Sequence, residues 1–287
     1  MRPAVSVVIA TRNYGRFLAG AIESVLKQTW TDFELLVIDD GSTDHTSEVV
    51  QPFLSDQRVH YHRTDGLGQS RAKNLGIQFS TAPLIAFLDG DDAWLPEKLD
   101  RQLPLFRDGR VGIVYGRRRI MGENGEDLPT PPSQLSRGDL SEVLIDRNPI
   151  CFSSVVVRRE VFETVGAFDE NLQLAIDYDL WLRASRRFDF DFVDEPVVRY
   201  RTGHANLSSR LRERIMTVLS ILRRFGGEPG VDPRAINRAI GSTCRTMGFV
   251  ARQEGVLPAA RWYFRAALHD GAWRASIKGI LGSVLGR

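Results

Sequence analysis

The feature that most constrains the fold is an alternation of short hydrophobic segments with amphipathic segments over the first ninety residues. The first segment, Val5–Ala10, is β-branched and apolar except for Ser6, as expected of a strand buried on both faces. Residues 15–29 follow with apolar side chains at helical spacing. The alternation continues with predicted strands at 33–40, 58–64 and 83–92 and predicted helices at 41–54 and 68–80. This order predicts an α/β fold with a doubly wound, mostly parallel sheet.

The remainder of the chain is less regular. We expect helices at 96–106, 159–168 and 177–188, strands at 111–116, 153–159 and 190–201, and a loop rich in Gly and Pro at 121–140. From about residue 208 the chain becomes helical and rich in arginine. We therefore expect a main domain at 1–207, with halves at 1–95 and 96–207, and a basic helical extension at 208–287.

Charge is distributed unevenly, although the formal net charge is only +2. Residues 201–287 contain 15 Lys and Arg against 5 Asp and Glu, a balance of +10, so residues 1–200 carry −8. The acidic first part argues against nucleic-acid binding there, and the basic part suits either an anionic surface or the acidic part itself.

The composition of the sequence also indicates the cellular compartment of the protein. No run of about 18 apolar residues predicts a membrane-spanning helix, and the apolar run at the N-terminus is too short for a signal peptide. Cys151 and Cys244 are too few for a disulfide framework. We therefore expect a cytoplasmic protein.

Three polar clusters follow predicted strands, at Thr11–Tyr14, Asp39–Asp40 and Asp89–Asp92. In a doubly wound sheet, ligands bind outside the carboxyl ends of the strands. We expect the three clusters to converge on one rim of the sheet.

The segment LDGDD crowds Asp89, Asp91 and Asp92 into one loop. Their charges repel one another, and a divalent cation would neutralise them. Carboxylate oxygens suit Mg²⁺ or Mn²⁺. A solvated acidic turn is the alternative, but the position after a buried strand favours a functional site.

Asp39 and Asp40 directly follow the second strand, where a carboxylate can accept hydrogen bonds from a ribose hydroxyl or a base N–H. The alternative role is a turn or helix cap. Thr11, Arg12 and Asn13 precede a helix N-terminus, whose backbone N–H groups favour a phosphate or a nucleotide. Capping of that helix is compatible with this role.

Asp177 and Asp179 lie two positions apart, about 200° around a helix axis, so they cannot serve one site from the same face. Asp177 stands at the helix start, as a site residue or an N-cap. Asp179 is expected to be solvated or paired with Arg183. His204 lies in a polar loop, and the residues alone favour no metal-binding role for it.

Several motifs are absent from the sequence. There is no GxGxxG after the first strand and no GxxxxGK[ST], which disfavours dinucleotide-binding dehydrogenases and P-loop enzymes. There is also no GxSxG and no zinc-like spacing of Cys and His.

Taken in order, the motifs resemble those of family 2 glycosyltransferases with the GT-A fold. The resemblance covers about residues 4–205 and rests on SVVIATRNYGRFLAGAIESVLKQTWTDFELLVIDDGSTDHT, GQSRAKNLGI, LIAFLDGDDAWLPEKL, GAFDENL, IDYDLWLR and YRTGHANLS. It implies an inverting transfer of a sugar from a nucleotide diphosphate, most often a uridine one. Residues 1–95 would then be the nucleotide-binding half and 96–207 the acceptor half.

The resemblance also implies roles for single residues in donor binding. Thr11 and Asp40 would hold the nucleoside, Asp39 would lie near it, and Arg71 would line the donor pocket. Arg12 and Asn13 belong to the same expected nucleotide-sugar site.

Further roles concern the metal and the base. Asp89–Gly90–Asp91 matches the family's Asp-X-Asp metal motif, with Asp91 as the direct ligand of Mn²⁺ or Mg²⁺ and Asp89 nearer the ribose. His204 matches a loop that closes over the diphosphate and the metal in relatives. Asp177 matches the catalytic base, although Ile176 stands where many relatives carry Glu.

The expected partners are a nucleotide-sugar donor and a saccharide or lipid-linked saccharide acceptor, without nucleic acid. The tail, with Trp262, Tyr263, Phe264 and Trp273 among arginines, suits either peripheral contact with the inner face of a membrane or packing as a helical cap or in a homodimer. Two alternative functions remain: an inactive sugar-nucleotide-binding module or partner subunit, and a nucleotidyltransferase or Asp-based phosphohydrolase. The latter is disfavoured because ATRN stands where such phosphohydrolases carry their nucleophile.

Overall fold

The computed structural model describes residues 2–204, 210–254 and 256–284. These residues form two compact units, one made of residues 2–140 and 149–204 and the other of residues 141–148 and the described residues from 210 onward. The predicted boundary at 207/208 lies outside the described residues.

The first unit contains one sheet, which has nine strands among the described residues, with β7 pairing on β6 beside the order β3-β2-β1-β4-β8-β6-β9-β5. Its strands are β1 (Val5–Thr11), β2 (Phe33–Asp39), β3 (Val59–Arg63), β4 (Leu84–Phe87), β5 (Ala93–Trp94), β6 (Val111–Met121), β7 (Asp127–Leu128), β8 (Val156–Arg158) and β9 (Asp189–Arg201). Its helices are α1 (Gly15–Leu26), α2 (Thr46–Val50), α3 (Gln69–Phe79), α4 (Lys98–Gln102), α6 (Arg159–Val165) and α7 (Ile176–Ala184).

The first four strands are parallel, as the alternation predicts. Beyond β4 the sheet becomes mixed: β8 runs antiparallel to both β4 and β6, and β9 returns parallel to β6. The predicted loop at 121–140 contains the two-residue strand β7, which pairs with the end of β6. The added strands extend the sheet without changing the rim at the ends of β1, β2 and β4.

Helices cover both faces of the parallel part, because alternate side chains of each strand point to opposite faces. Val5, Val7 and Ile9 pack in one core cluster with the buried face of α1. Val8 points to the other face, where a Cβ added at Gly76 of α3 would lie 2.3 Å from Val8 Cγ1. This burial on both faces explains the continuous hydrophobic run of β1.

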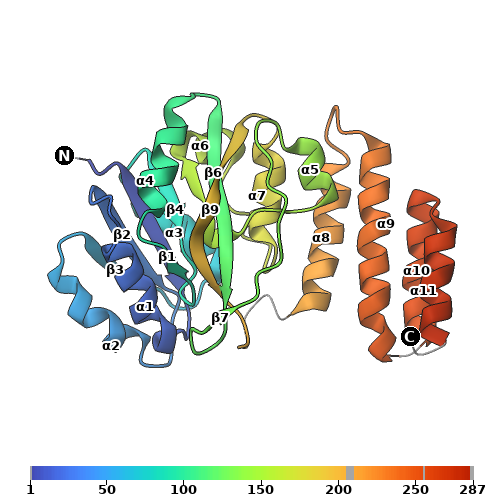
Figure 1. Cartoon of the computed structure of the whole chain (residues 1–287), viewed down its shortest axis with the longest axis horizontal. Helices are drawn as coiled ribbons and strands as arrows, with labels where there is room; N and C mark the ends of the chain where they lie inside the picture. The colour runs from blue at the N-terminus through green and yellow to red at the C-terminus, as the bar shows by residue number, and fades with distance from the viewer. Residues whose placement is uncertain (1, 205–209, 255, 285–287) are drawn as a thin grey trace. The chain divides into compact units, whose positions relative to one another are not determined.

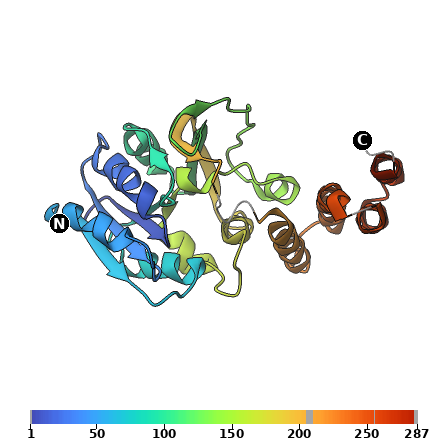
Figure 2. The same ribbon diagram turned by 90° about the horizontal axis from the view of Figure 1, so that it is seen from below.

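The second unit is helical in its described part. It consists of α5 (Ser141–Asp146), α8 (Leu211–Phe225), α9 (Pro233–Val250), α10 (Val256–Asp270) and α11 (Trp273–Val284). The last four pack each against the next, and α5 contacts α9 (Figures 1 and 2). Asp232 caps α9 by accepting the backbone N–H groups of Arg234 and Ala235. None of the described helices combines the length and the apolar character needed to cross a bilayer.

Candidate active site

The ends of three neighbouring strands bring Thr11, Asp40 and Gly90 together. Thr11 ends β1 opposite Asp39 of β2, and the backbone N–H of Asp40 donates to the carbonyl of Thr11 at 2.8 Å. β4 lies on the other side of β1, and a Cβ added at Gly90 would meet Thr11 Oγ1 at 2.9 Å. The three polar clusters therefore share one rim, as parallel strand ends require.

The acidic loop after β4 is held by Ser153 and Arg201. Asp92 is buried, and its carboxylate accepts hydrogen bonds from Ser153 Oγ at 2.5 Å and from the backbone N–H of Arg201 at 2.8 Å. Ser153 Oγ also accepts the backbone N–H of Asp89 at 3.1 Å, and Arg201 Nε donates to the carbonyl of Asp91 at 2.7 Å. Both residues thus fix the path of the loop.

Asp91 and His204 form a close pair within this site. Asp91 Oδ2 lies 2.8 Å from His204 Nε2, and the side chains are 11% and 1% exposed, respectively. The imidazole packs edge-on against the rings of Phe17 and Tyr14, with ring centres 4.9 and 5.9 Å apart. The histidine to which the residues alone gave no role therefore lies directly beside the acidic loop.

Negative charge is concentrated at this point. Burial raises the pKa of Asp91, and the charge of Asp89 raises it further, while His204 acts in the opposite direction. Burial also raises the pKa of the Tyr14 hydroxyl, and Asp91 is the next cause. The ammonium of Lys73 lies 3.2 Å from Asp89 Oδ1. A divalent cation placed here would stabilise the ionised carboxylates.

Among the buried side-chain atoms that have no hydrogen-bond partner in the described part of the chain, two lie at the rim, Thr11 Oγ1 and His204 Nδ1. Buried polar groups in proteins are nearly always paired, so such atoms mark places where a ligand or an ordered water supplies the partner. Both belong to residues that line the rim.

The carboxylate oxygens of Asp91 and the imidazole nitrogen of His204 are suitable ligands for a divalent cation. A carboxylate suits Mg²⁺ or Mn²⁺, and the imidazole favours a transition metal such as Mn²⁺. Among the described residues there is no group of three or more His, Cys, Asp or Glu side chains that could hold a metal ion. These two residues would therefore share the ion with waters and substrate phosphates, an arrangement common for Mg²⁺.

Asp39 and Asn13 support the loop after β2. Asp39 is fully buried, and its carboxylate accepts the backbone N–H of Ser42 at 2.8 Å and the hydroxyl of Tyr61 at 2.7 Å. Asn13 has a left-handed φ of 59°, and its Oδ1 accepts the backbone N–H of Thr43 at 2.7 Å. Through these contacts, both side chains hold the loop after β2 at the rim.

Asp40 is buried at the start of the neighbouring loop. Its Oδ1 accepts hydrogen bonds from Thr64 Oγ1 at 2.9 Å and from the backbone N–H of Leu67 at 2.6 Å, and its Oδ2 accepts the backbone N–H of Gly68 at 2.9 Å. Arg12 approaches Oδ2 at 4.0 Å with a largely exposed guanidinium. The carboxylate thus organises the segment that leads into α3.

The loop before α7 is fastened to the same region. Ser70, in the first turn of α3, donates through Oγ to the carbonyl of Leu172 at 2.9 Å. Asp177 lies in the first turn of α7 and is half-buried. Ala175 precedes this helix with a left-handed φ of 52°, which turns the chain sharply into α7. The start of α7 is therefore tied to the start of α3, whose preceding loop binds Asp40.

Two other predicted residues have local partners. Arg71 Nε lies 2.9 Å from Glu170 Oε2 in an exposed ion pair. Asp179 is paired with Arg183 at 2.8 Å, which is one of its two predicted environments, and it is buried rather than solvated. Arg183 also donates to the carbonyls of residues 165–167, so this pair joins α7 to the loop after α6.

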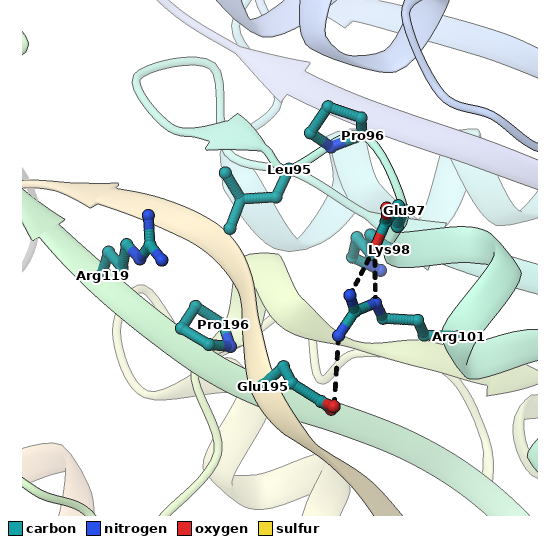
Figure 3. A pocket seen from close by; sticks show the side chains of 8 residues that line it. All are labelled: Leu95, Pro96, Glu97, Lys98, Arg101, Arg119, Glu195 and Pro196. Atoms are coloured by element: carbon teal, nitrogen blue, oxygen red, sulfur yellow. Dashed lines mark hydrogen bonds and ion pairs between the residues drawn. The ribbon is translucent and has the colours of Figure 1, made fainter.

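A separate groove of about 360 Å³ lies at the β5 edge of the sheet, along β5 and β9 (Figure 3). Arg101 bridges Glu97 and Glu195 across one end of it, the latter at 3.3 Å. The groove includes none of the predicted site residues. Its remaining lining residues are Leu95, Pro96, Lys98, Arg119 and Pro196.

The sequence interpretation did not select Tyr14, Lys73, Ser153 or Arg201, although all four contact or surround the acidic loop. Tyr14, Lys73 and Arg201 lie within the motifs quoted above, and this position is their only signal in the sequence. Ser153 had no comparable signal, because its role depends on a contact with Asp92, 61 positions away in the chain.

The sheet and the rim define an α/β protein whose polar side chains gather at the carboxyl ends of parallel strands, and comparison with known sequences identifies its family. The model of "Glycosyl transferase family 2" matches residues 6–166, more than half of the chain, and the chain belongs to this family. The Escherichia coli UDP-Glc:alpha-D-GlcNAc-diphosphoundecaprenol beta-1,3-glucosyltransferase WfgD is 35% identical over 240 residues, which cover 78% of this chain and 87% of that protein.

Other relatives are longer. An uncharacterized glycosyltransferase from Rickettsia felis is 31% identical over 197 residues, which are 69% of this chain but 33% of the relative. An uncharacterized glycosyltransferase from Nostoc is 36% identical over 174 residues, which are 58% of this chain and 54% of the relative. The chain thus spans about a third to a half of the length of these relatives.

Solved structures confirm the predicted GT-A fold. Staphylococcus aureus TarS 1–349 in complex with UDP-GlcNAc has a TM-score of 0.68 at 15% identity, covering 99% of this chain and 90% of that one. The mannosyltransferase PcManGT from Pyrobaculum calidifontis in complex with GDP-Man and Mn²⁺ has a TM-score of 0.64 at 15% identity, covering 99% and 87%. At these identities the likeness establishes the fold alone.

Proposed function

We propose that this protein is an inverting glycosyltransferase that moves a sugar from a nucleotide diphosphate, with a uridine diphosphate sugar as the first candidate, to an acceptor hydroxyl. The observation that carries the proposal is the Asp91–His204 pair, at 2.8 Å, on the rim that also holds Thr11 and Asp40. This acid and imidazole, on the same rim as the unpartnered Thr11 hydroxyl, would hold a metal-bound diphosphate.

Donor binding is assigned to the strand ends. Thr11 Oγ1, which lacks a partner among the described residues, is available to the nucleoside. Arg12 is largely exposed beside Asp40 and available to an anionic group, and Arg71 is proposed to line the donor pocket once released from Glu170. Asp89 and Gly90 would lie against the ribose, and Asp39 and Asn13 would support the loops around it.

Asp91 and His204 would hold the divalent cation, which when bound neutralises charge on the leaving diphosphate. Tyr14 and Phe17 keep the His204 ring in place by packing against it. Arg201 holds the acidic loop through the backbone of Asp91, so the carboxylate is positioned before the donor arrives.

Asp177 is proposed as the general base. The acceptor oxygen forms a bond to the anomeric carbon while the bond from that carbon to the diphosphate breaks, and the electron pair leaves with the diphosphate. The proton of the acceptor hydroxyl passes to a carboxylate oxygen of Asp177. Attack opposite the leaving group inverts the anomeric carbon.

The acceptor is proposed to be a lipid-linked saccharide. The support is the sequence likeness to WfgD, whose name specifies a diphosphoundecaprenol-linked acceptor and a UDP-glucose donor. UDP-glucose is therefore the first donor to assay, with other nucleotide sugars beside it.

The decisive experiment combines donor binding and turnover in the Asp177→Asn variant. Binding of UDP with Mn²⁺, measured by calorimetry, should stay within about twofold of the parent protein, while sugar transfer should fall at least about 100-fold, the lower range for general-base loss. Unchanged turnover would overturn the assignment of the base. Donor binding without any transfer by the parent protein would instead favour an inactive nucleotide-sugar-binding module.

A further inference from the structure

Helix α10 is apolar on two opposite faces. Its inner face carries the buried residues Ala259, Tyr263 and Ala266, and Tyr263 lies close to Gly248 of α9 and Gly279 of α11. Its outer face carries Leu257 and Leu268, which are 77% and 63% exposed. These two leucines have no apolar cover in the described part of the chain.

The exposed apolar side chains form one stripe. At about 100° per residue, Leu257, Phe264 and Leu268 fall within an arc of about 40° on α10. On α11, Trp273 and Ile277 are separated by about 40°. The rings of Phe264 and Trp273 meet edge to face with centres 5.7 Å apart, which joins the two helices into one surface. We call these five residues the α10–α11 face.

Large exposed hydrophobic side chains are concentrated here. Phe264, Trp273 and Ile277 are 52%, 46% and 51% exposed, and few other helices of the described chain carry more than one such residue. Contiguous exposed apolar surface marks a contact site for a protein or a membrane.

The charge around this face is positive. Arg261 borders the apolar arc of α10, about 20° beyond Leu268, and is exposed, as are Arg265 and Lys278. Asp270 is the only acidic residue in the sequence from 256 to 284. Its side chain is 4% exposed and lies 2.5 Å from the guanidinium of Arg245, so its charge is paired inside the unit. Exposed cations therefore flank the α10–α11 face, and no exposed carboxylate lies among the described residues of α10 and α11.

We propose that the α10–α11 face binds the surface of a membrane that contains anionic lipids. Aromatic and leucine side chains would enter the headgroup boundary while the flanking cations meet lipid phosphates, as in interfacial helices. A second copy of this chain fits less well, because a twofold contact through the same face would bring Arg261 and Arg265 of both copies together. This inference rests on the proposed function, because membrane binding would give the enzyme access to a lipid-linked acceptor.

The test is co-sedimentation of the full-length protein with vesicles of phosphatidylcholine, with and without phosphatidylglycerol. The parent protein should bind the anionic vesicles more tightly and lose affinity as salt increases. The double variant Phe264→Ser/Leu268→Ser should weaken this binding at least about 10-fold. The double variant Arg261→Gln/Lys278→Gln should weaken it by about fivefold per cation for anionic vesicles only.

The matched control is Leu54→Ser, which removes an exposed leucine from the first unit and should leave vesicle binding unchanged. Melting curves verify that every variant is folded. Equal vesicle binding by the parent protein and Phe264→Ser/Leu268→Ser would overturn the proposal. Conversion of a lipid-free dimer to a monomer by that variant, seen by analytical ultracentrifugation, would assign the face to self-association instead.

Sugar transfer to a water-soluble acceptor separates this proposal from the proposed function. The face variants should retain that activity within about twofold, because none of the substituted residues belongs to the candidate active site. A parent protein that binds vesicles but transfers no sugar would contradict the enzyme proposal and leave the membrane-binding face standing.

Discussion

His204 Nε2 lies 2.8 Å from Asp91 Oδ2, although 113 positions separate the two residues in the chain. The contact depends on the end of β9 reaching the loop after β4, two elements that are not neighbours in sequence. It joins an imidazole to the one carboxylate of the acidic loop that the family resemblance assigns to the metal.

Loss of either partner should weaken metal-dependent donor binding. For His204→Ala and Asp91→Asn we expect the affinity for UDP in the presence of Mn²⁺ to fall at least about 10-fold, because metal-site partners typically contribute that much. Titration calorimetry with Mn²⁺ and with excess EDTA measures the effect.

The control for this prediction is Asp32→Asn, which removes an exposed aspartate ahead of β2, at the other end of the sheet. Its UDP affinity should equal that of the parent protein with Mn²⁺. Equal affinities for His204→Ala and Asp32→Asn would contradict the assignment of His204 to the metal.

Ser153→Ala should destabilise the protein and weaken donor binding together. The substitution removes the hydroxyl that joins the Asp92 carboxyl group to the backbone of Asp89, and a buried polar group loses a hydrogen bond. We expect a loss of about 1–3 kcal/mol in the free energy of unfolding. Urea denaturation measures it, with Ser55→Ala, an exposed serine, as the matched control that should change little.

Gly90→Ala should impair donor binding because of close packing. The added methyl group would lie 2.9 Å from Thr11 Oγ1, so Thr11 or the acidic loop must move. Gly109→Ala is the matched control, since nothing lies within 4 Å of its added Cβ. Thermal stabilisation by UDP and Mn²⁺ should shrink for the first variant only, and an equal response in both would rule out this packing effect.

Cys151 should be unreactive in the folded protein. Burial raises the pKa of its thiol to about 12, and the charge of Asp92 contributes, so the thiol stays protonated at pH 8. Burial also raises the pKa of the Cys244 thiol. Because the thiolate is the nucleophile, neither should react with Ellman's reagent at pH 8 until guanidinium unfolds the chain. Rapid labelling of a folded protein would contradict the burial of both side chains.

Much of the first half of the fold could be predicted because its information is local. The run Val5–Ala10 and the helical spacing that follows it identify β1 and α1 without any distant contact. Strand direction beyond β4 is different, because β8 has only three residues and its antiparallel pairing depends on contacts with β4 and β6. The spacing of apolar residues does not indicate whether such a short strand pairs parallel or antiparallel.

The same distinction applies to the candidate site. The acidic residues were recognisable from their position after predicted strands. The partners of Arg71 and Asp92 were not, because Glu170 and Ser153 are reached only through the folded chain, 99 and 61 positions away. Asp179 shows the intermediate case: its partner Arg183 is local and was predicted, but the burial of the pair depends on the loop after α6.

Arg201 has one more consequence. Its main-chain amide and its guanidinium grip neighbouring aspartates, and its Nη1 reaches the carbonyl of Glu123 at 2.7 Å. The side chain of Arg201 thus joins three segments that are distant in sequence: the end of β9, the acidic loop and the loop at Glu123. A substitution in one segment therefore limits which substitutions the other two tolerate. In related sequences, we expect a change at position 201 to be accompanied by changes in the two loops that Arg201 contacts.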